Sequence, residues 1–176
     1  MNIKEHITIY HPDQKVCELV SKLTGFKTKQ ASIADATENC IVSAGNCFGT
    51  MDGGSDLALM QKFPGLQARV MEAVEPFNPL GNPEIIWLER IGDTYGIYHD
   101  KFLVHIPTMP TPHIKIPISI IYVCYLNLFM MFWRRVFTDI AMPMFGTGWG
   151  GHSYEDSCKV MNEAFELANK INGFVA

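Results

Sequence analysis

The chain has few charged residues and few cysteines, and it lacks the short motifs of several common site classes. Only 18% of its 176 residues are charged, and the net charge is −4. Broad binding to DNA, RNA or anionic membranes needs a basic face, so this composition argues against it. A nucleotide held in a cleft is not excluded, because backbone N–H groups can replace net charge there.

The cysteines and histidines are not arranged as metal or disulfide sites. The cysteines number five and form no C-x-x-C pair, which argues against a zinc site or a secreted disulfide framework. Reduced thiols in a cytoplasmic or nuclear setting are the simplest interpretation, and residues 1–6 carry no signal-peptide apolar region. No H-x-x-x-H pair occurs, so we expect neither a metal nor a cofactor. Two histidines, His105 and His152, are placed where they could approach a cleft.

Two catalytic motifs are also missing, and one apolar segment could be either a membrane span or a buried helix. The chain has no GxxxxGK[ST] sequence of a P-loop and no G-x-S-x-G elbow of a hydrolase. Residues 116–133 contain no charge and reach the lower length limit of a membrane span. They include a proline and several polar residues, and a helix buried against a sheet has the same composition. We therefore favour a buried helix and expect no membrane partner.

Apolar periodicity predicts strands that alternate with helices. Hydrophobic residues make up 48% of the chain, which is typical of a compact protein. The pattern predicts one domain over residues 1–176, with an α/β fold in which a mixed, largely parallel sheet lies between helices. The expected strands are 6–10, 40–44, 84–91, 101–106 and 139–145, and the expected helices are 16–23, 55–62, 66–74, 118–135 and 153–171.

Two glycine-rich turns are the strongest functional signal, and each follows an expected strand and precedes an expected helix. The first runs from Asn46 to Asp56, and the second contains four glycines between Gly146 and Gly151. Glycine lets backbone N–H groups approach an anion closely, and a following helix adds its positive end. Ligands of such sheets bind beyond the carboxyl ends of the strands. We therefore expect the two turns to hold a phosphate-containing ligand from two sides.

Several side chains in these turns have two interpretations each. The amide of Asn46 suits a ribose diol, but it also suits an Asx turn. The carboxylates of Asp52 and Asp56 could position a water or a sugar hydroxyl, or they could complement a helix dipole. In the second turn, Thr147 offers a hydroxyl donor and Trp149 a flat cover for a sugar or base, although a tryptophan here could equally belong to the core.

Taken together in their order, these motifs resemble the macro domain family, whose members bind ADP-ribose. Residues 43–46 are similar to the family's N-[AP]-A-N strand end, and residues 53–59 resemble its G-G-V-D-x-A-I helix start. Residues 140–151 are similar to I-A-x-P-x-I-[SG]-T-G-x-x-G, and residues 104–107 and 124–126 resemble two further family segments. The string F-G-x-M-D-G-G-x-D over residues 48–56 looks most like a microbial, viral and fungal branch.

The resemblance implies a three-layer α/β/α sandwich with an ADP-ribose cleft. It assigns Asn46 to the distal ribose and implies that Asp56 helps to position that ribose or a water. The implied partner is ADP-ribose or an ADP-ribosylated macromolecule, bound by a chain that we expect to be monomeric. The implied ligand-binding residues are Ser32, Ile33, Ala44, Gly45, Asn46, Gly53, Gly54, Gly146, Thr147, Gly148, Trp149 and Gly150.

The chain departs from the family pattern in four segments. The family's G-D-I, whose Asp reads the adenine amino group, is Ala31-Ser32-Ile33 here, so adenine recognition must change, with Asp35 or a backbone group as candidates. Gly45 replaces a small alanine, Asp52 stands where many members have glycine, and Trp149 is bulkier than the usual isoleucine or valine.

Our leading hypothesis is a hydrolase that cuts an ADP-ribose linkage, with Asp52, Asp56 and Asn46 as catalytic candidates. Removal of ADP-ribose from a modified target and processing of ADP-ribose 1″-phosphate both fit. The alternative is a non-catalytic reader of ADP-ribose or a related nucleotide, because binding needs only the two turns.

Overall fold

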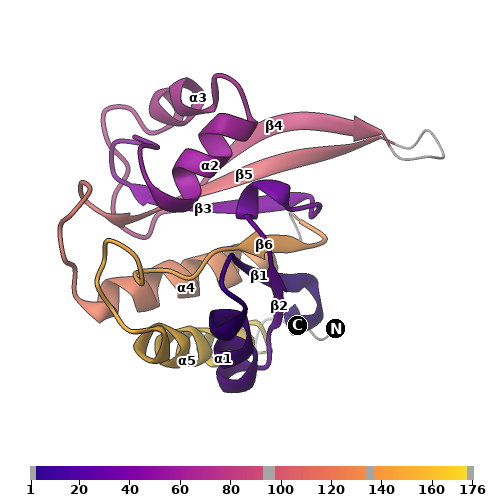
Figure 1. Ribbon diagram of the computed structural model, residues 1–176, viewed down its shortest axis with the longest axis vertical. Coiled ribbons are helices and arrows are strands. Elements are labelled where there is room, and N and C mark those ends of the chain that lie inside the picture. The colour runs from indigo at the N-terminus through magenta and orange to yellow at the C-terminus, as the bar shows by residue number, and fades with distance from the viewer. Residues whose placement is uncertain (1–2, 93–97, 134–136, 174–176) are drawn as a thin grey trace.

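Among the described residues, six strands form one central sheet and five helices cover its two faces (Figure 1). The computed structural model describes residues 3–92, 98–133 and 137–173. The strand order is β2-β1-β6-β3-β5-β4, and every pair is parallel except β4 with β5. The strands are β1 Ile7–His11, β2 Lys27–Gln30, β3 Cys40–Asn46, β4 Glu84–Gly92, β5 Tyr98–Met109 and β6 Ile140–Met142.

The helices form two layers, so the expected three-layer α/β/α arrangement is confirmed. Figure 1 shows α1, α4 and α5 on one side of the sheet and α2 and α3 on the other. Two apolar clusters, one on each face, fill the space between these layers and the sheet. The helices are α1 Gln14–Thr24, α2 Gly54–Lys62, α3 Leu66–Ala73, α4 Ile118–Trp133 and α5 Tyr154–Gly173, with short 3₁₀ turns η1 Ile3–His6 and η2 Ile33–Asp35.

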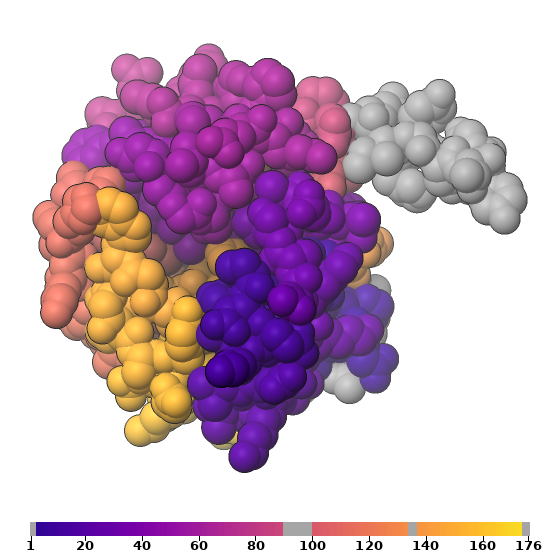
Figure 2. Space-filling model, in the orientation of Figure 1, coloured from indigo at the N-terminus to yellow at the C-terminus, as the bar shows by residue number. Residues whose placement is uncertain are grey.

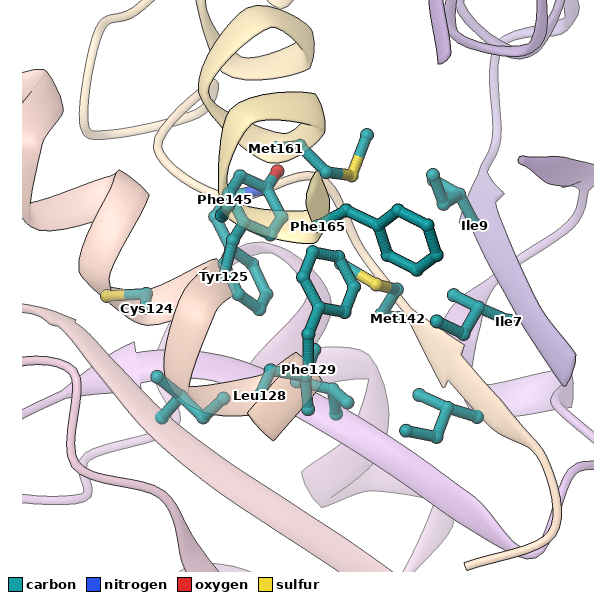
Figure 3. Packing of buried hydrophobic residues seen from close by; sticks show 14 of the residues in the cluster. Ile7, Ile9, Cys124, Tyr125, Leu128, Phe129, Met142, Phe145, Met161 and Phe165 are labelled. Atoms are coloured by element: carbon teal, nitrogen blue, oxygen red, sulfur yellow. The ribbon is translucent and has the colours of Figure 1, made fainter. Parts of the chain in front are cut away.

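Aromatic side chains fill the core between the sheet, α4 and α5 (Figure 3). The rings of Tyr125 and Phe145 stack with centroids 4.4 Å apart, and Phe129 meets Phe165 edge to face at 5.3 Å. Such pairs stabilise a fold by about 0.5–1.5 kcal/mol beyond the burial of their area. This packing accounts for the apolar sequence of α4. No helix in the described part of the chain is long and apolar enough to cross a membrane.

A closed ring of three hydrogen bonds lies inside this aromatic core. The backbone N–H of Phe145 donates to Tyr125 Oη at 2.8 Å, and Ser157 Oγ donates to the Phe145 carbonyl at 2.8 Å. Tyr125 Oη and Ser157 Oγ are themselves 2.8 Å apart, so the tyrosine hydroxyl donates to the serine and completes the ring. Each buried polar group has its partner. The ring holds the chain in place immediately before the second glycine-rich turn.

Three elements differ from the sequence-based expectation. Strand β2 was not predicted, because Lys27–Gln30 is a polar edge strand whose exposed side chains leave no apolar alternation. Strand β6 ends at Met142, earlier than expected, since Pro143 has no N–H for the ladder. Strand β5 runs from Tyr98 to Met109 and is therefore longer at both ends than the expected strand over residues 101–106. The expected end of α4 at Arg135 lies outside the described residues.

Removing the Tyr125 hydroxyl tests the hydrogen-bonded ring. In Tyr125→Phe the aromatic packing remains, but the buried Phe145 N–H loses its acceptor and Ser157 Oγ loses its donor. We expect the free energy of unfolding to fall by about 1–3 kcal/mol, measured by urea denaturation. Tyr122→Phe on the same helix is the matched control and should change stability little. Equal stability of wild type and Tyr125→Phe would contradict a structural role for the ring.

Candidate functional site

A cavity runs along the carboxyl ends of the parallel strands. It has a volume of about 500 Å³ and meets the ends of β2, β1, β6, β3 and β5. At about 4.8 Å between neighbouring strands, five strands span roughly 19 Å, which is long enough for a dinucleotide-sized ligand. In Figure 2 the N-terminal segment, the region around α2 and the segment after β6 all reach the same face of the molecule. We call this cavity the cleft.

The second glycine-rich turn forms one wall of the cleft from Gly146 to Gly150. Its conformation needs glycine, because Gly146 has φ 73° and a Cβ at Gly150 would lie 2.6 Å from the Gly146 carbonyl oxygen. Internal hydrogen bonds from Gly151 N to Gly148 O and from His152 N to Gly146 O keep the turn compact. The five residues that the sequence predicted here all line the cleft.

The first turn forms the opposite wall, and Trp149 bridges the two. Gly53 and Gly54 line the cleft at the start of α2. A Cβ at Gly53 would lie 3.3 Å from Trp149 Cζ2, so the indole rests directly on this glycine, while its ring also contacts His113. The indole is 43% exposed, which places it at the surface as a cover and not in the core.

Three buried side chains, Ser43 on β3, His105 on β5 and Asp56 on α2, form one hydrogen-bonded chain. Ser43 Oγ lies 2.8 Å from Asp56 Oδ1 and 3.1 Å from His105 Nδ1. On its other side, His105 Nε2 lies 3.0 Å from the carbonyl oxygen of Asn46, which can only accept. Both Ser43 and His105 are fully buried, and Asp56 is 5% exposed. We call this group the Asp56–Ser43–His105 chain.

Both hydrogen bonds of Ser43 can form at once only if Asp56 is protonated or His105 is doubly protonated. If His105 is neutral, its Nδ1 accepts from Ser43, and Asp56 must be protonated to donate to the serine. If Asp56 is ionised, Ser43 donates to it, and His105 must then donate from both nitrogens. Burial raises the pKa of Asp56 to about 7 and lowers the pKa of His105, and nearby Asp52 also raises the pKa of Asp56. Both shifts favour the neutral pair.

None of the three predicted catalytic side chains lines the cleft. Asn46 is buried, and its amide is used locally: Nδ2 donates to the carbonyl and hydroxyl of Thr50, and Oδ1 accepts from Phe48 N. Asp52 is exposed, while Asp56 is buried. All three lie beside the β3 end of the cleft, so the structure brings them together next to the cavity and not within it.

Gly45 also lies outside the cleft lining, and its role is steric. A Cβ at this position would overlap Cε1 of His105 and come within 2.9 Å of Asp56 Oδ2. Glycine here therefore makes room for the buried imidazole. The other predicted ligand-binding residues, Ser32, Ile33 and Ala44, do line the cleft. Of the two histidines considered, His105 is part of the Asp56–Ser43–His105 chain, and His152 Nε2 lies 2.8 Å from the Ile116 carbonyl.

The opposite end of the cleft, at β1 and β2, contains residues that sequence reasoning missed. His11 ends β1, and its Nε2 lies 3.0 Å from the hydroxyl of Tyr154 at the start of α5, with the rings edge to face. The sequence could have indicated both residues, because His11 lies at the end of a strand and Tyr154 at the start of a helix. The candidate Asp35 is exposed and does not line the cleft. The missed lining residues are Tyr10, His11, Pro12, Ala31, Ser55, Ala58, Thr108, Met109, Pro143, Met144 and Tyr154.

The family model for the macro-like domain matches residues 12–173, which is most of the chain. The chain belongs to the macro-like domain family. A comparison with curated proteins gave no match.

Solved macrodomains share the fold at low sequence identity. The macrodomain of Mycobacterium tuberculosis DarG superposes with a TM-score of 0.65 at 20% identity, covering 79% of this chain and 88% of that one. A variant of the Oceanobacillus iheyensis macrodomain with ADPR gives 0.63 at 17% identity, covering 96% and 80%. Thermosipho africanus DarTG in complex with ADP-ribose gives 0.63 at 14% identity, covering 90% and 50%.

The raised pKa of Asp56 predicts a pH dependence of stability for this macrodomain. The carboxyl ionises near pH 4 in the unfolded chain and near pH 7 in the folded protein. Between these values the folded state retains a proton that the unfolded state has lost, so stability falls as pH rises. In Asp56→Asn this titration is absent. Relative to wild type, we expect the variant to gain up to about 4 kcal/mol between pH 4 and pH 7 and nothing further above it.

Urea unfolding from pH 4 to pH 8 measures this difference directly. The contribution of His105 has the opposite sign, because a lowered histidine pKa makes stability rise with pH. Glu18→Gln, which removes an exposed carboxylate on α1, is measured alongside as the surface control. A difference between Asp56→Asn and wild type that stays constant from pH 4 to pH 7 would contradict the raised pKa of Asp56.

Proposed function

We propose that this macrodomain binds ADP-ribose in the cleft and hydrolyses an ADP-ribose linkage. The observation that supports it most directly is the shape of the cleft, which runs between the two glycine-rich turns and across five strand ends. The proposal places the diphosphate against the glycine-rich wall of residues 146–150, where backbone N–H groups can bind it. Homologues of this fold with ADPR or ADP-ribose bound support the same ligand.

The proposed chemistry takes place at the β3 end of the cleft. A water oxygen attacks the anomeric carbon of the distal ribose, the bond from that carbon to the target breaks, and the departing group takes up a proton. Asp52 is the exposed carboxylate beside this end and the candidate for accepting the water's proton. Asp56 holds a proton up to about pH 7, so in the Asp56–Ser43–His105 chain it positions the strand end that carries Asn46.

A specific observation also favours the alternative of a non-catalytic reader. Neither Asp52 nor Asp56 lines the cleft, and the side chain of Asn46 is occupied by Thr50 and Phe48. A reader needs only the turns. Under either function a reducing compartment such as the cytoplasm or nucleus fits the chain, since all five cysteines are free and buried.

Calorimetry with ADP-ribose tests the binding proposal. We expect wild type to bind ADP-ribose more tightly than AMP, because AMP lacks the second phosphate and the distal ribose. Gly148→Asp should weaken binding at least tenfold, or about 1.4 kcal/mol, by placing a negative charge beside the diphosphate. A Cβ at Gly148 would meet no neighbouring atom within 4 Å, so we expect the fold to remain intact.

The control for this variant is Gly173→Asp, which adds the same charge in open space at the end of α5. It should bind ADP-ribose as wild type does. The binding proposal is refuted if folded wild type gives no heat and no thermal shift with millimolar ADP-ribose.

Release of ADP-ribose separates the enzyme from the reader. The substrates are protein ADP-ribosylated on carboxylate side chains, ADP-ribosylated single-stranded DNA and ADP-ribose 1″-phosphate. We expect product from at least one, and a rate about 100-fold lower in Asp52→Ala with ADP-ribose affinity retained. Asp35→Ala, an exposed carboxylate that does not line the cleft, is the control and should keep the rate. Unchanged substrates after long incubation with protein that binds ADP-ribose would favour the reader.

A further inference from the structure

Charged side chains are absent from the described residues that line the cleft. The lining contains no Asp, Glu, Lys or Arg, and its polar groups are hydroxyls, the His11 imidazole, the Trp149 indole and backbone. A ligand that lies in the cleft is therefore recognised by neutral groups. A hydroxyl can donate or accept a hydrogen bond, whereas a carboxylate can only accept. A cleft lined by hydroxyls can therefore bind both hydrogen-bond donors and hydrogen-bond acceptors of a ligand.

The hydrogen bonds of His11 determine which way the Tyr154 hydroxyl donates. The backbone N–H of Asp13 donates to His11 Nδ1 at 3.0 Å, so Nδ1 has no hydrogen and Nε2 carries it. Nε2 then donates to Tyr154 Oη at 3.0 Å. The hydroxyl hydrogen of Tyr154 has no acceptor among the described residues. Both residues line the cleft, so this hydrogen is available to a ligand.

Ser32 presents a second hydroxyl of the same kind. Its oxygen accepts from the backbone N–H of Ala34 at 3.2 Å, where it caps the 3₁₀ turn η2. The hydroxyl hydrogen is free to rotate toward the cleft. The T-shaped pair of His11 and Tyr154, with centroids 5.5 Å apart, adds flat apolar surface at the same end. This end of the cleft therefore combines ring surface with two hydroxyls that both donate and accept.

We propose that the ambivalent hydroxyls of Ser32 and Tyr154 make the β1 end of the cleft unable to tell a 6-amino purine from a 6-oxo purine. The proposal rests on the proposed function, since it places the base of ADP-ribose here. A 6-amino group needs an acceptor and a 6-oxo group needs a donor, and a rotating hydroxyl supplies either. The site therefore accepts hypoxanthine as readily as adenine, and its substrate class includes inosine diphosphate ribose as well as ADP-ribose.

Paired calorimetric titrations test this base tolerance. Wild type is titrated with ADP-ribose and with inosine diphosphate ribose, and we expect dissociation constants within about threefold of each other. Ser32→Asp replaces the ambivalent hydroxyl by an acceptor and keeps a residue that caps helices well. It should favour ADP-ribose over the inosine compound by about tenfold or more.

Tyr154→Phe provides the second arm. It keeps the ring surface and removes the hydroxyl, so both ligands should weaken by a similar factor of about five to ten. Tyr122→Phe, a tyrosine outside the cleft, should change neither affinity. The Ser32→Asp result stands by itself if Tyr154→Phe does not fold.

The outcomes separate this inference from the function on which it rests. Wild type that binds ADP-ribose but rejects the inosine compound more than tenfold overturns the base assignment and leaves the proposed function intact. Equal binding of both ligands by Ser32→Asp overturns the base assignment as well. Folded wild type that binds neither ligand overturns both proposals.

Discussion

The closed hydrogen-bond ring of Tyr125, Phe145 and Ser157 is the constraint on which the rest of the site depends. Strand β6 ends at Met142, so nothing in the sheet itself holds the chain that continues into the second glycine-rich turn. The ring ties that continuation to α4 and α5, two helices that pack on one face of the sheet. Because every member is satisfied, the arrangement has one favourable geometry. The ring fixes Phe145, the residue immediately before the glycine-rich turn, and so fixes where that turn begins.

The site separates charge from recognition. The cleft is lined by neutral groups, while the Asp56–Ser43–His105 chain is buried and Asp52 lies at the surface. A dinucleotide diphosphate brings its own negative charge, so carboxylates within the cavity would repel it. The one buried carboxyl next to the cavity is kept neutral at moderate pH by its low-dielectric surroundings. The distribution of charge is thus compatible with an anionic ligand despite the acidic composition.

Sequence reasoning succeeded where a local pattern determines the local structure. Both glycine-rich turns, the buried helix over residues 118–133 and the three-layer arrangement follow from short-range spacing and apolar periodicity. It failed where the answer depends on partners far along the chain. His11 and Tyr154 are 143 positions apart and meet only because the sheet order places β1 beside the start of α5. The burial of Asp56 likewise depends on Ser43 and His105, which no spacing rule connects.

Gly45 has a consequence for how the sequence can change over time. A Cβ at position 45 would overlap the buried imidazole of His105, so a side chain at position 45 and a histidine at position 105 cannot coexist. A side chain at position 45 needs a smaller residue 105, and a smaller residue 105 removes the hydrogen bonds that the imidazole makes with Ser43 Oγ and the Asn46 carbonyl. Each single step is therefore disfavoured, and Asp56 must shift as well, because its Oδ2 would lie 2.9 Å from a Cβ at position 45. We therefore expect Gly45 and His105 to be retained together in proteins that keep the buried Asp56–Ser43–His105 chain.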